Sequence, residues 1–224
     1  MKPEIIVTGF PNTGTSFLCN LVVALGKSPG NTEDLKEGDK HNRYGYFENL
    51  EIRKITYKAL GCDYFNPWEK GFLPDRPYSF EPEKLNEYSS LITEIAEKDN
   101  VEVYKDNTIP LIFRIFPKEA KFINITREPK KAYESPQKGG HSRIPCSFAE
   151  FIVYYEKYQD LVKQMSNEVD CIGVRYEDFY DNFDGTLNTI ARHIEVEIDD
   201  TKLKACKKIF RPRHNIIKRI YKLF

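Results

Sequence analysis

Cysteines are few in this sequence, and their spacing excludes two common kinds of small protein. There are five in 224 residues, and no two of them have the C-x-x-C spacing. An odd number of widely spaced cysteines argues against a disulfide framework and against a zinc knuckle, so no metal site is predicted. Reduced structural thiols are expected at Cys19, Cys62, Cys146, Cys171 and Cys206.

Long apolar runs and a net charge are also absent. No stretch approaches the roughly 18 consecutive apolar residues of a membrane-spanning helix. The apolar residues 5–7 follow Met1 too closely to leave room for a signal peptide, so a cytoplasmic location is expected. The 34 basic residues balance the 34 acidic ones. The chain as a whole therefore gives no electrostatic argument for a nucleic-acid or membrane partner.

Segments typical of strands alternate with segments typical of helices along the chain. This alternation predicts βαβ units around a parallel sheet, whose ligands usually lie at the carboxyl ends of the strands. The length fits one domain, residues 1–224, with a possible basic helical tail at residues 202–224. The apolar spacing predicts strands at residues 5–8, 101–104, 121–125 and 169–174, and helices at residues 16–25, 109–116, 129–135, 147–165, 187–194 and 202–210.

The loop after the first strand has the spacing of a phosphate-binding loop, or P-loop. Four residues separate Gly9 from Gly14, and Thr15 and Ser16 follow at the start of the predicted helix. In such a loop, backbone N–H groups and the helix N-terminus converge on a phosphate. Thr15 stands where a loop that binds ATP or GTP carries lysine, which disfavours a nucleoside triphosphate. The alternative is a tight strand-to-helix turn without a ligand.

Two segments carry a resemblance to a known family. Residues 11–16 read Pro-Asn-Thr-Gly-Thr-Ser, and a strand that ends at Arg127 is followed eight residues later by Ser135. Both resemble signatures of the sulfotransferases that use 3′-phosphoadenosine 5′-phosphosulfate (PAPS), especially the compact bacterial type. In that family, the loop holds the 5′-phosphosulfate, and the arginine and serine hold the 3′-phosphate. A planar guanidinium suits this task because it can donate two parallel hydrogen bonds to a phosphate.

Further segments fall in the order expected of the family. Tyr176 resembles the family's tyrosine near the adenine, and Lys105 matches a lysine at a strand end. Residues 45–49 are similar to a Gly-aromatic-aromatic-Glu-Asn stretch of bacterial members. The basic segment that contains Arg211 and Arg213 resembles one that can close over the nucleotide.

The resemblance implies an α/β, three-layer P-loop NTPase-like fold with a central parallel sheet flanked by helices. It implies a transferase that moves the sulfuryl group of PAPS, without a metal, to a hydroxyl or amine of a small-molecule or carbohydrate acceptor. Adenosine 3′,5′-bisphosphate (PAP) is then the product. The residues expected to bind the nucleotide are Pro11, Asn12, Thr13, Gly14, Thr15, Ser16, Arg127, Ser135, Tyr176, Arg211 and Arg213.

Glu48, Lys105 and Asn12 are expected to govern the chemistry. Glu48 is the predicted base, because a carboxylate in a partly desolvated cleft can have its pKa raised toward neutrality; His41 is the rival base. Asn12 replaces the cation that usually stabilises the leaving group, and the loss of such a donor can cost on the order of 10² to 10³ in rate. Lys105 is predicted to supply the missing charge, and the alternative is an ordinary surface lysine.

Other interpretations stay open. A small-molecule kinase shares the fold but is disfavoured by Thr15, whereas Asn12 favours a non-catalytic or weakly active nucleotide-binding protein. The aromatic residues between positions 64 and 80 either contact the acceptor or pack on themselves. Structural alternatives are a capping or surface Glu48, an ion pair of Arg127 with Glu128 or Glu134, a Ser135 that only ends a helix, and a Tyr176 in the core. The basic tail has a membrane-surface or anionic-substrate role as its alternative.

Overall fold

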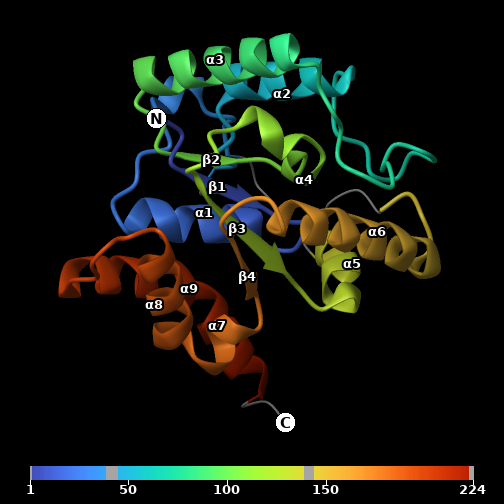
Figure 1. Cartoon of the computed structure of the whole chain (residues 1–224). Coiled ribbons are helices and arrows are strands. Elements are labelled where there is room, and N and C mark those ends of the chain that lie inside the picture. The colour runs from blue at the N-terminus through green and yellow to red at the C-terminus, as the bar shows by residue number, and fades with distance from the viewer. Residues whose placement is uncertain (1, 39–44, 139–143, 222–224) are drawn as a thin grey trace.

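The protein is described from a computed structural model. The structure describes residues 2–38, 45–138 and 144–221, with side chains as far as Phe210. A four-stranded parallel sheet forms its centre (Figure 1). The strands lie in the order β2-β1-β3-β4 and span Ile5–Thr8 (β1), Val103–Lys105 (β2), Lys121–Thr126 (β3) and Cys171–Arg175 (β4).

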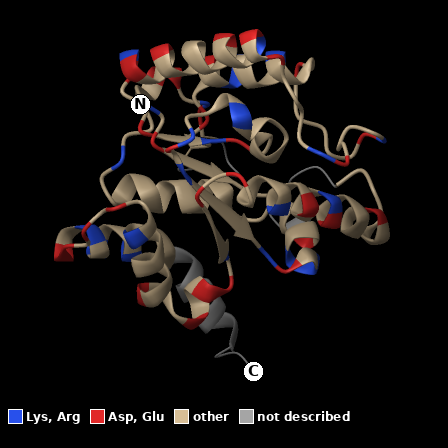
Figure 2. Cartoon of the chain, viewed as in Figure 1, with Lys and Arg blue, Asp and Glu red and all other residues tan. Residues whose placement is uncertain are grey.

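Helices cover both faces of the sheet (Figure 1). They are α1 (Thr15–Ala24), α2 (Leu50–Leu60), α3 (Pro82–Lys98), α4 (Ile109–Ile112), α5 (Pro129–Lys138), α6 (Phe148–Ser166), α7 (Asp178–Asp181), α8 (Phe183–His193) and α9 (Asp200–Tyr221), with 3-10 turns η1 (Thr32–Asp34) and η2 (Phe113–Ile115). Basic and acidic residues are intermixed along the outer helices α3 and α6 (Figure 2).

Strand β1 shows how the sequence builds three layers. Ile6 belongs to a buried apolar cluster with residues of α2, α3, α4 and α6, whereas Ile5 and Val7 belong to a second cluster with residues of α1, α8 and α9. Successive side chains of a strand point to opposite faces, so a continuous apolar run suits a strand buried on both sides. The predicted three-layer α/β fold with a central parallel sheet is confirmed.

Several predicted boundaries need correction. The helix predicted at residues 109–116 is divided into α4 and η2. The helix predicted at residues 129–135 continues through Pro136 to Lys138. The helices α2 and α3 lie in a region where no helix was predicted. Local signals for α2 are the cap by Asn49, whose side chain accepts from two backbone N–H groups, and the left-handed Gly61 at its end.

The parallel direction of the strands brings four chain segments to one edge of the sheet. β1 leads into residues 9–16, and β2 ends at Lys105, which pairs in register with Val7. β3 ends one residue before Arg127, and β4 ends one residue before Tyr176.

All five cysteines are free of disulfide bonds. Among the described helices, none combines the length and apolar character needed to cross a membrane.

Candidate functional site

The loop between β1 and α1 has a backbone shaped for an anion. Asn12 and Gly14 have φ angles of 68° and 107°, so both occupy the left-handed region. The Thr13 hydroxyl donates to the Phe10 carbonyl at 2.7 Å and fixes the turn internally. Gly14 precedes α1 and provides no side-chain cap. The first N–H groups of a helix lack partners within the helix, so this end of α1 suits a negatively charged group.

Both loop glycines are required by close neighbours. A Cβ atom at Gly9 would lie 2.5 Å from the Ile125 carbonyl oxygen on β3. A Cβ atom at Gly14 would lie 2.6 Å from Cδ2 of Tyr176. The loop therefore packs tightly against β3 and against the segment that follows β4, which argues for a rigid loop in place of an adaptable turn.

Arg127 connects this loop to the start of α5. Its Nη1 atom donates to the carbonyl oxygen of Asn12 and to the hydroxyl of Ser135, each at 3.2 Å. The guanidinium lies over the Tyr176 ring, 4.7 Å from its centroid. The structure thus brings together the two predicted phosphate-binding features. The alternative partner Glu128 instead pairs with Lys131 at 2.6 Å.

A cavity of about 690 Å³ opens beside Arg127. Lys131 and Arg175 also line it, together with the acidic Glu128, Glu177 and Asp181. This volume is within the range of about 300–1,000 Å³ that small-molecule sites occupy. The Nε atom of Arg127 is buried and has no hydrogen-bond partner among the described residues. A buried unpaired donor is costly, and an anionic ligand would satisfy it.

Tyr176 has a supporting position beside the loop. Its side chain is only 3% exposed, and its ring packs edge-on against Phe17 at 5.3 Å between centroids. Together with the contact at Gly14, this packing fixes the first turn of α1 against the end of β4. Tyr176 is therefore packed in the core, as the structural alternative predicted. Its contact with an adenine stays a prediction.

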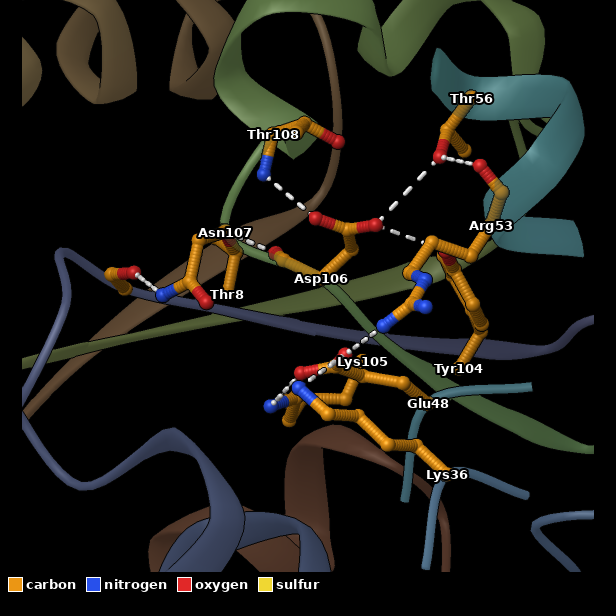
Figure 3. A network of polar contacts seen from close by, with 11 residues as sticks. Thr8, Lys36, Glu48, Arg53, Thr56, Tyr104, Lys105, Asp106, Asn107 and Thr108 are labelled. Atoms are coloured by element: carbon orange, nitrogen blue, oxygen red, sulfur yellow. Dashed lines mark hydrogen bonds and ion pairs between the residues drawn. The ribbon is translucent and has the colours of Figure 1, made fainter. Parts of the chain in front are cut away.

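A second group of charged residues surrounds Glu48 (Figure 3). Lys105 Nζ lies 2.7 Å from Oε1 of Glu48, and Arg53 Nη1 lies 2.8 Å from Oε2. Lys36 Nζ lies 3.7 Å from Oε2. Glu48 and Lys105 are 9% and 2% exposed, so Lys105 is not an ordinary surface lysine. Three cations from separate segments thus converge on one buried carboxylate.

The pKa of Glu48 departs from its ordinary value in the direction opposite to the prediction. Burial acts to raise the pKa of Glu48, but the charges of Lys105 and Lys36 and the hydrogen bonds from Lys105 and Arg53 outweigh burial and lower it. The prediction considered desolvation alone and missed the cations. Glu48 is consequently ionised at neutral pH, which a proton acceptor requires, but it is held as a weak base.

Asp106 fixes the chain directly after β2, beside this group. Its carboxylate accepts hydrogen bonds from the Thr108 amide at 2.8 Å and the Tyr104 hydroxyl at 2.9 Å (Figure 3). Burial, and next the charge of Glu48, raise the pKa of Asp106. The adjacent Asn107 side chain donates to the carbonyl of Gly9. The strand end that holds Lys105 is therefore connected directly to the P-loop.

Sequence reasoning missed Asp106 and Arg53. An acidic residue directly after a strand at the carboxyl edge of the sheet was an available signal for Asp106. Arg53 had no local signal, because its contact with Glu48 depends on how α2 packs. The predicted His41 lies outside the described residues, and the side chains of Arg211 and Arg213 lie outside the described side chains.

The aromatic residues between positions 64 and 80 divide into inward and outward members. Trp68 contacts Phe10 of the loop edge-on at 5.4 Å and stacks on Phe151 of α6 at 5.7 Å. Tyr64 is 61% exposed. Much of this aromatic surface is thus used to pack the segment against the core.

Among the described residues, no group of three metal-binding side chains was found.

The parallel sheet and the loop at its carboxyl edge define an α/β protein of the P-loop type. The sequence model described as "Sulfotransferase family" matches residues 3–200. The chain therefore belongs to the sulfotransferase family. No curated protein sequence gives a significant match.

Solved sulfotransferases share the fold. The sulfotransferase domain of the Synechococcus PCC 7002 olefin synthase aligns with a TM-score of 0.50 and 16% identity, covering 91% of this chain and 77% of that one. Mouse sulfotransferase SULT7A1, solved with PAP, aligns with a TM-score of 0.51 and 13% identity, and the alignment covers 93% of this chain and 65% of that one. The sulfotransferase domain from the curacin biosynthetic pathway aligns with a TM-score of 0.50 and 13% identity, and the alignment covers 92% of this chain and 78% of that one. At these identities, the likeness shows the fold alone.

Proposed function

We propose that this protein transfers the sulfuryl group of PAPS to a hydroxyl or amine of a small-molecule or carbohydrate acceptor. The observation that carries the proposal is the contact of Arg127 with both Ser135 and the carbonyl of Asn12. One guanidinium thereby joins the proposed 3′-phosphate residue Ser135 to the P-loop, an arrangement suited to a nucleotide with two separate phosphate groups. The mouse sulfotransferase of the same fold was solved with PAP, which supports this choice of nucleotide.

The residues present fit such a nucleotide. The N-terminus of α1 and the hydroxyls of Thr15 and Ser16 are proposed to hold the 5′-phosphosulfate. The Thr13 hydroxyl, which donates to the Phe10 carbonyl, and the neighbouring Pro11 shape the loop instead. Arg127 and Ser135 are proposed to hold the 3′-phosphate. When bound, PAPS supplies the sulfuryl group and PAP leaves. Tyr176, Arg211 and Arg213 remain proposed nucleotide contacts, and the cytoplasmic location and single domain remain predictions.

Glu48 and Lys105 are proposed to divide the work of catalysis. Glu48 would accept the proton of the acceptor hydroxyl or amine. Lys105 would stabilise charge on the leaving phosphate, a task for which Asn12 has no positive charge. Each now neutralises the other across 2.7 Å. Catalysis therefore requires this ion pair to loosen when the substrates bind.

A thermal-shift titration with PAP, ATP and GTP tests the proposal. PAP should raise the unfolding temperature, because a ligand at 100 times its Kd stabilises the folded state by about 2.7 kcal/mol. Arg127→Ala should remove most of the PAP shift, whereas the exposed Arg192→Ala on α8 should retain it. Stabilisation by ATP or GTP alone would point to a kinase and sink the proposal.

A non-catalytic nucleotide-binding protein is the second candidate, and the uncharged Asn12 favours it. The two candidates differ in turnover of PAPS with a panel of hydroxyl and amine acceptors. The proposed enzyme should lose turnover in Glu48→Gln and in Lys105→Ala. If PAP binds and neither substitution changes turnover with an accepted substrate, the catalytic assignments are wrong.

A further inference from the structure

Positive charge exceeds negative charge around Glu48. Lys36, Arg53 and Lys105 all lie within 4.0 Å of its two carboxylate oxygens. The buried Asp106 offsets at most one of these charges, and burial and Glu48 both act against its ionisation. The described residues therefore leave a net positive charge in a partly dry site. Such a site attracts a further anion.

Arg53 contacts Glu48 and also lines a cavity. One guanidinium nitrogen bonds to Glu48, while the side chain remains 27% exposed and lines a cavity of about 750 Å³ along α2. No residue of the P-loop or of the Arg127 site lines this cavity. A ligand in the α2 cavity would thus contact Arg53, the partner of Glu48, from a side separate from the proposed nucleotide site.

The α2 cavity is lined by both basic and acidic side chains. Its lining includes Arg53, Lys54 and Lys58 against Glu51 and Asp63. Lys54 is already paired with Glu51 at 2.6 Å, and Lys58 lies 3.6 Å from a carboxylate oxygen of Glu87. Tyr57, one helical turn from Arg53, supplies an aromatic wall. The cavity charge nearest the proposed base is thus that of Arg53, which contacts Glu48 at 2.8 Å.

We propose that the acceptor carries an anionic group, a carboxylate or a sulfate a few bonds from its hydroxyl or amine, and that Arg53 binds this group. This inference rests on the proposed function and names the substrate class of the same site. Arg53 is suited to the task because its unused nitrogens can donate to the anion while Nη1 still touches Glu48. The anion would thereby place the acceptor hydroxyl beside the carboxylate that takes its proton.

Acceptor binding would also adjust the base. An anion that draws Arg53 toward itself weakens the Arg53 hydrogen bond that helps to hold the pKa of Glu48 low, so the opposing effect of burial raises that pKa. The acceptor proton passes to Glu48 as the acceptor–sulfur bond forms and the bond from sulfur to the bridging phosphate oxygen breaks. The electron pair of that bond stays on PAP. Other described titratable groups that interact with Glu48 are Asp106, Tyr57, Tyr104 and Cys19.

Two matched pairs of probes test the inference by calorimetric titration. They are 4-hydroxyphenylacetate with its neutral amide, and 4-hydroxybenzenesulfonate with its neutral sulfonamide. Each is titrated at constant ionic strength with and without saturating PAP. The variants are Arg53→Gln, Glu48→Gln and, as a control, the exposed Lys84→Gln on α3, with folding of each checked by circular dichroism.

At least one anion should bind about tenfold or more tightly than its neutral partner, since a charge-assisted hydrogen bond is lost in the amide. Arg53→Gln should abolish this preference, and Lys84→Gln should keep it. Glu48→Gln should strengthen anion binding, because Arg53 then has no competing carboxylate. Equal affinities within both pairs, no binding of any probe, or a preference that survives Arg53→Gln would overturn the inference. If PAP binds in the same titrations and PAPS is turned over with a neutral acceptor, the proposed function stands even when the inference fails.

Discussion

The ammonium of Lys105 lies 2.7 Å from Oε1 of Glu48, and both side chains are buried. Buried ion pairs are costly to desolvate and seldom increase stability relative to apolar residues. This pair stands at the carboxyl edge of the sheet, beside the P-loop, where ligands of such folds usually bind. A functional purpose explains its position better than a purely structural one.

The pair makes stability depend on pH. The folded-state pKa of Glu48 is lowered, so the stabilisation is fully present above the ordinary pKa of about 4.3 and is lost as the pH falls through the folded-state value. Lys105→Met should lower the free energy of urea unfolding by about 3 kcal/mol at neutral pH. This difference should shrink toward pH 3. A difference that is constant with pH would contradict the assigned pair.

Gly14→Ala should be more damaging than a similar change elsewhere. The residue has a φ angle of 107°, and its new Cβ would meet the Tyr176 ring at 2.6 Å. Gly61→Ala is the matched control, with a φ angle of 66° and no atom within 4 Å of the new Cβ. We expect urea unfolding to show a loss of about 1–2 kcal/mol for Gly61→Ala and a larger loss for Gly14→Ala. Equal losses would mean that Tyr176 does not confine the loop.

The presence of asparagine at position 12 is explained in part by the backbone conformation there. Its φ angle of 68° lies in the left-handed region, where asparagine is enriched, and its carbonyl accepts from Arg127. Asn12→Lys should therefore cost about 1 kcal/mol of stability. If leaving-group charge is limiting, the same variant should raise the turnover of PAPS by about 10². Unchanged turnover would indicate that Lys105 already supplies the charge.

Arg127→Lys should not rescue Arg127→Ala. A lysine keeps the charge but cannot reproduce contacts to Ser135, to the loop carbonyl and to the face of Tyr176 at the same time. PAP affinity measured by calorimetry should fall about tenfold or more in the lysine variant. Wild-type affinity in that variant would show that charge alone is recognised.

Sequence reasoning was most successful where the geometry depends on a short continuous segment. The P-loop and the spacing from Arg127 to Ser135 could be predicted because backbone geometry and helix periodicity are local. The direction of the Glu48 pKa could not, since it depends on Lys36, Arg53 and Lys105, which are brought together only by packing. The helices α2 and α3 were missed because proline, glycine and aromatic residues between them suggested one long loop.

The claim that the site recognises a nucleotide with a separate 3′-phosphate is tested most directly by calorimetric titration of the wild-type protein with PAP and with adenosine 5′-monophosphate, which lacks that phosphate. At constant ionic strength, PAP should bind at least about tenfold more tightly, because Arg127 and Ser135 would hold the additional phosphate through charge-assisted hydrogen bonds. Equal affinities for the two nucleotides, or no binding of PAP, would contradict the account.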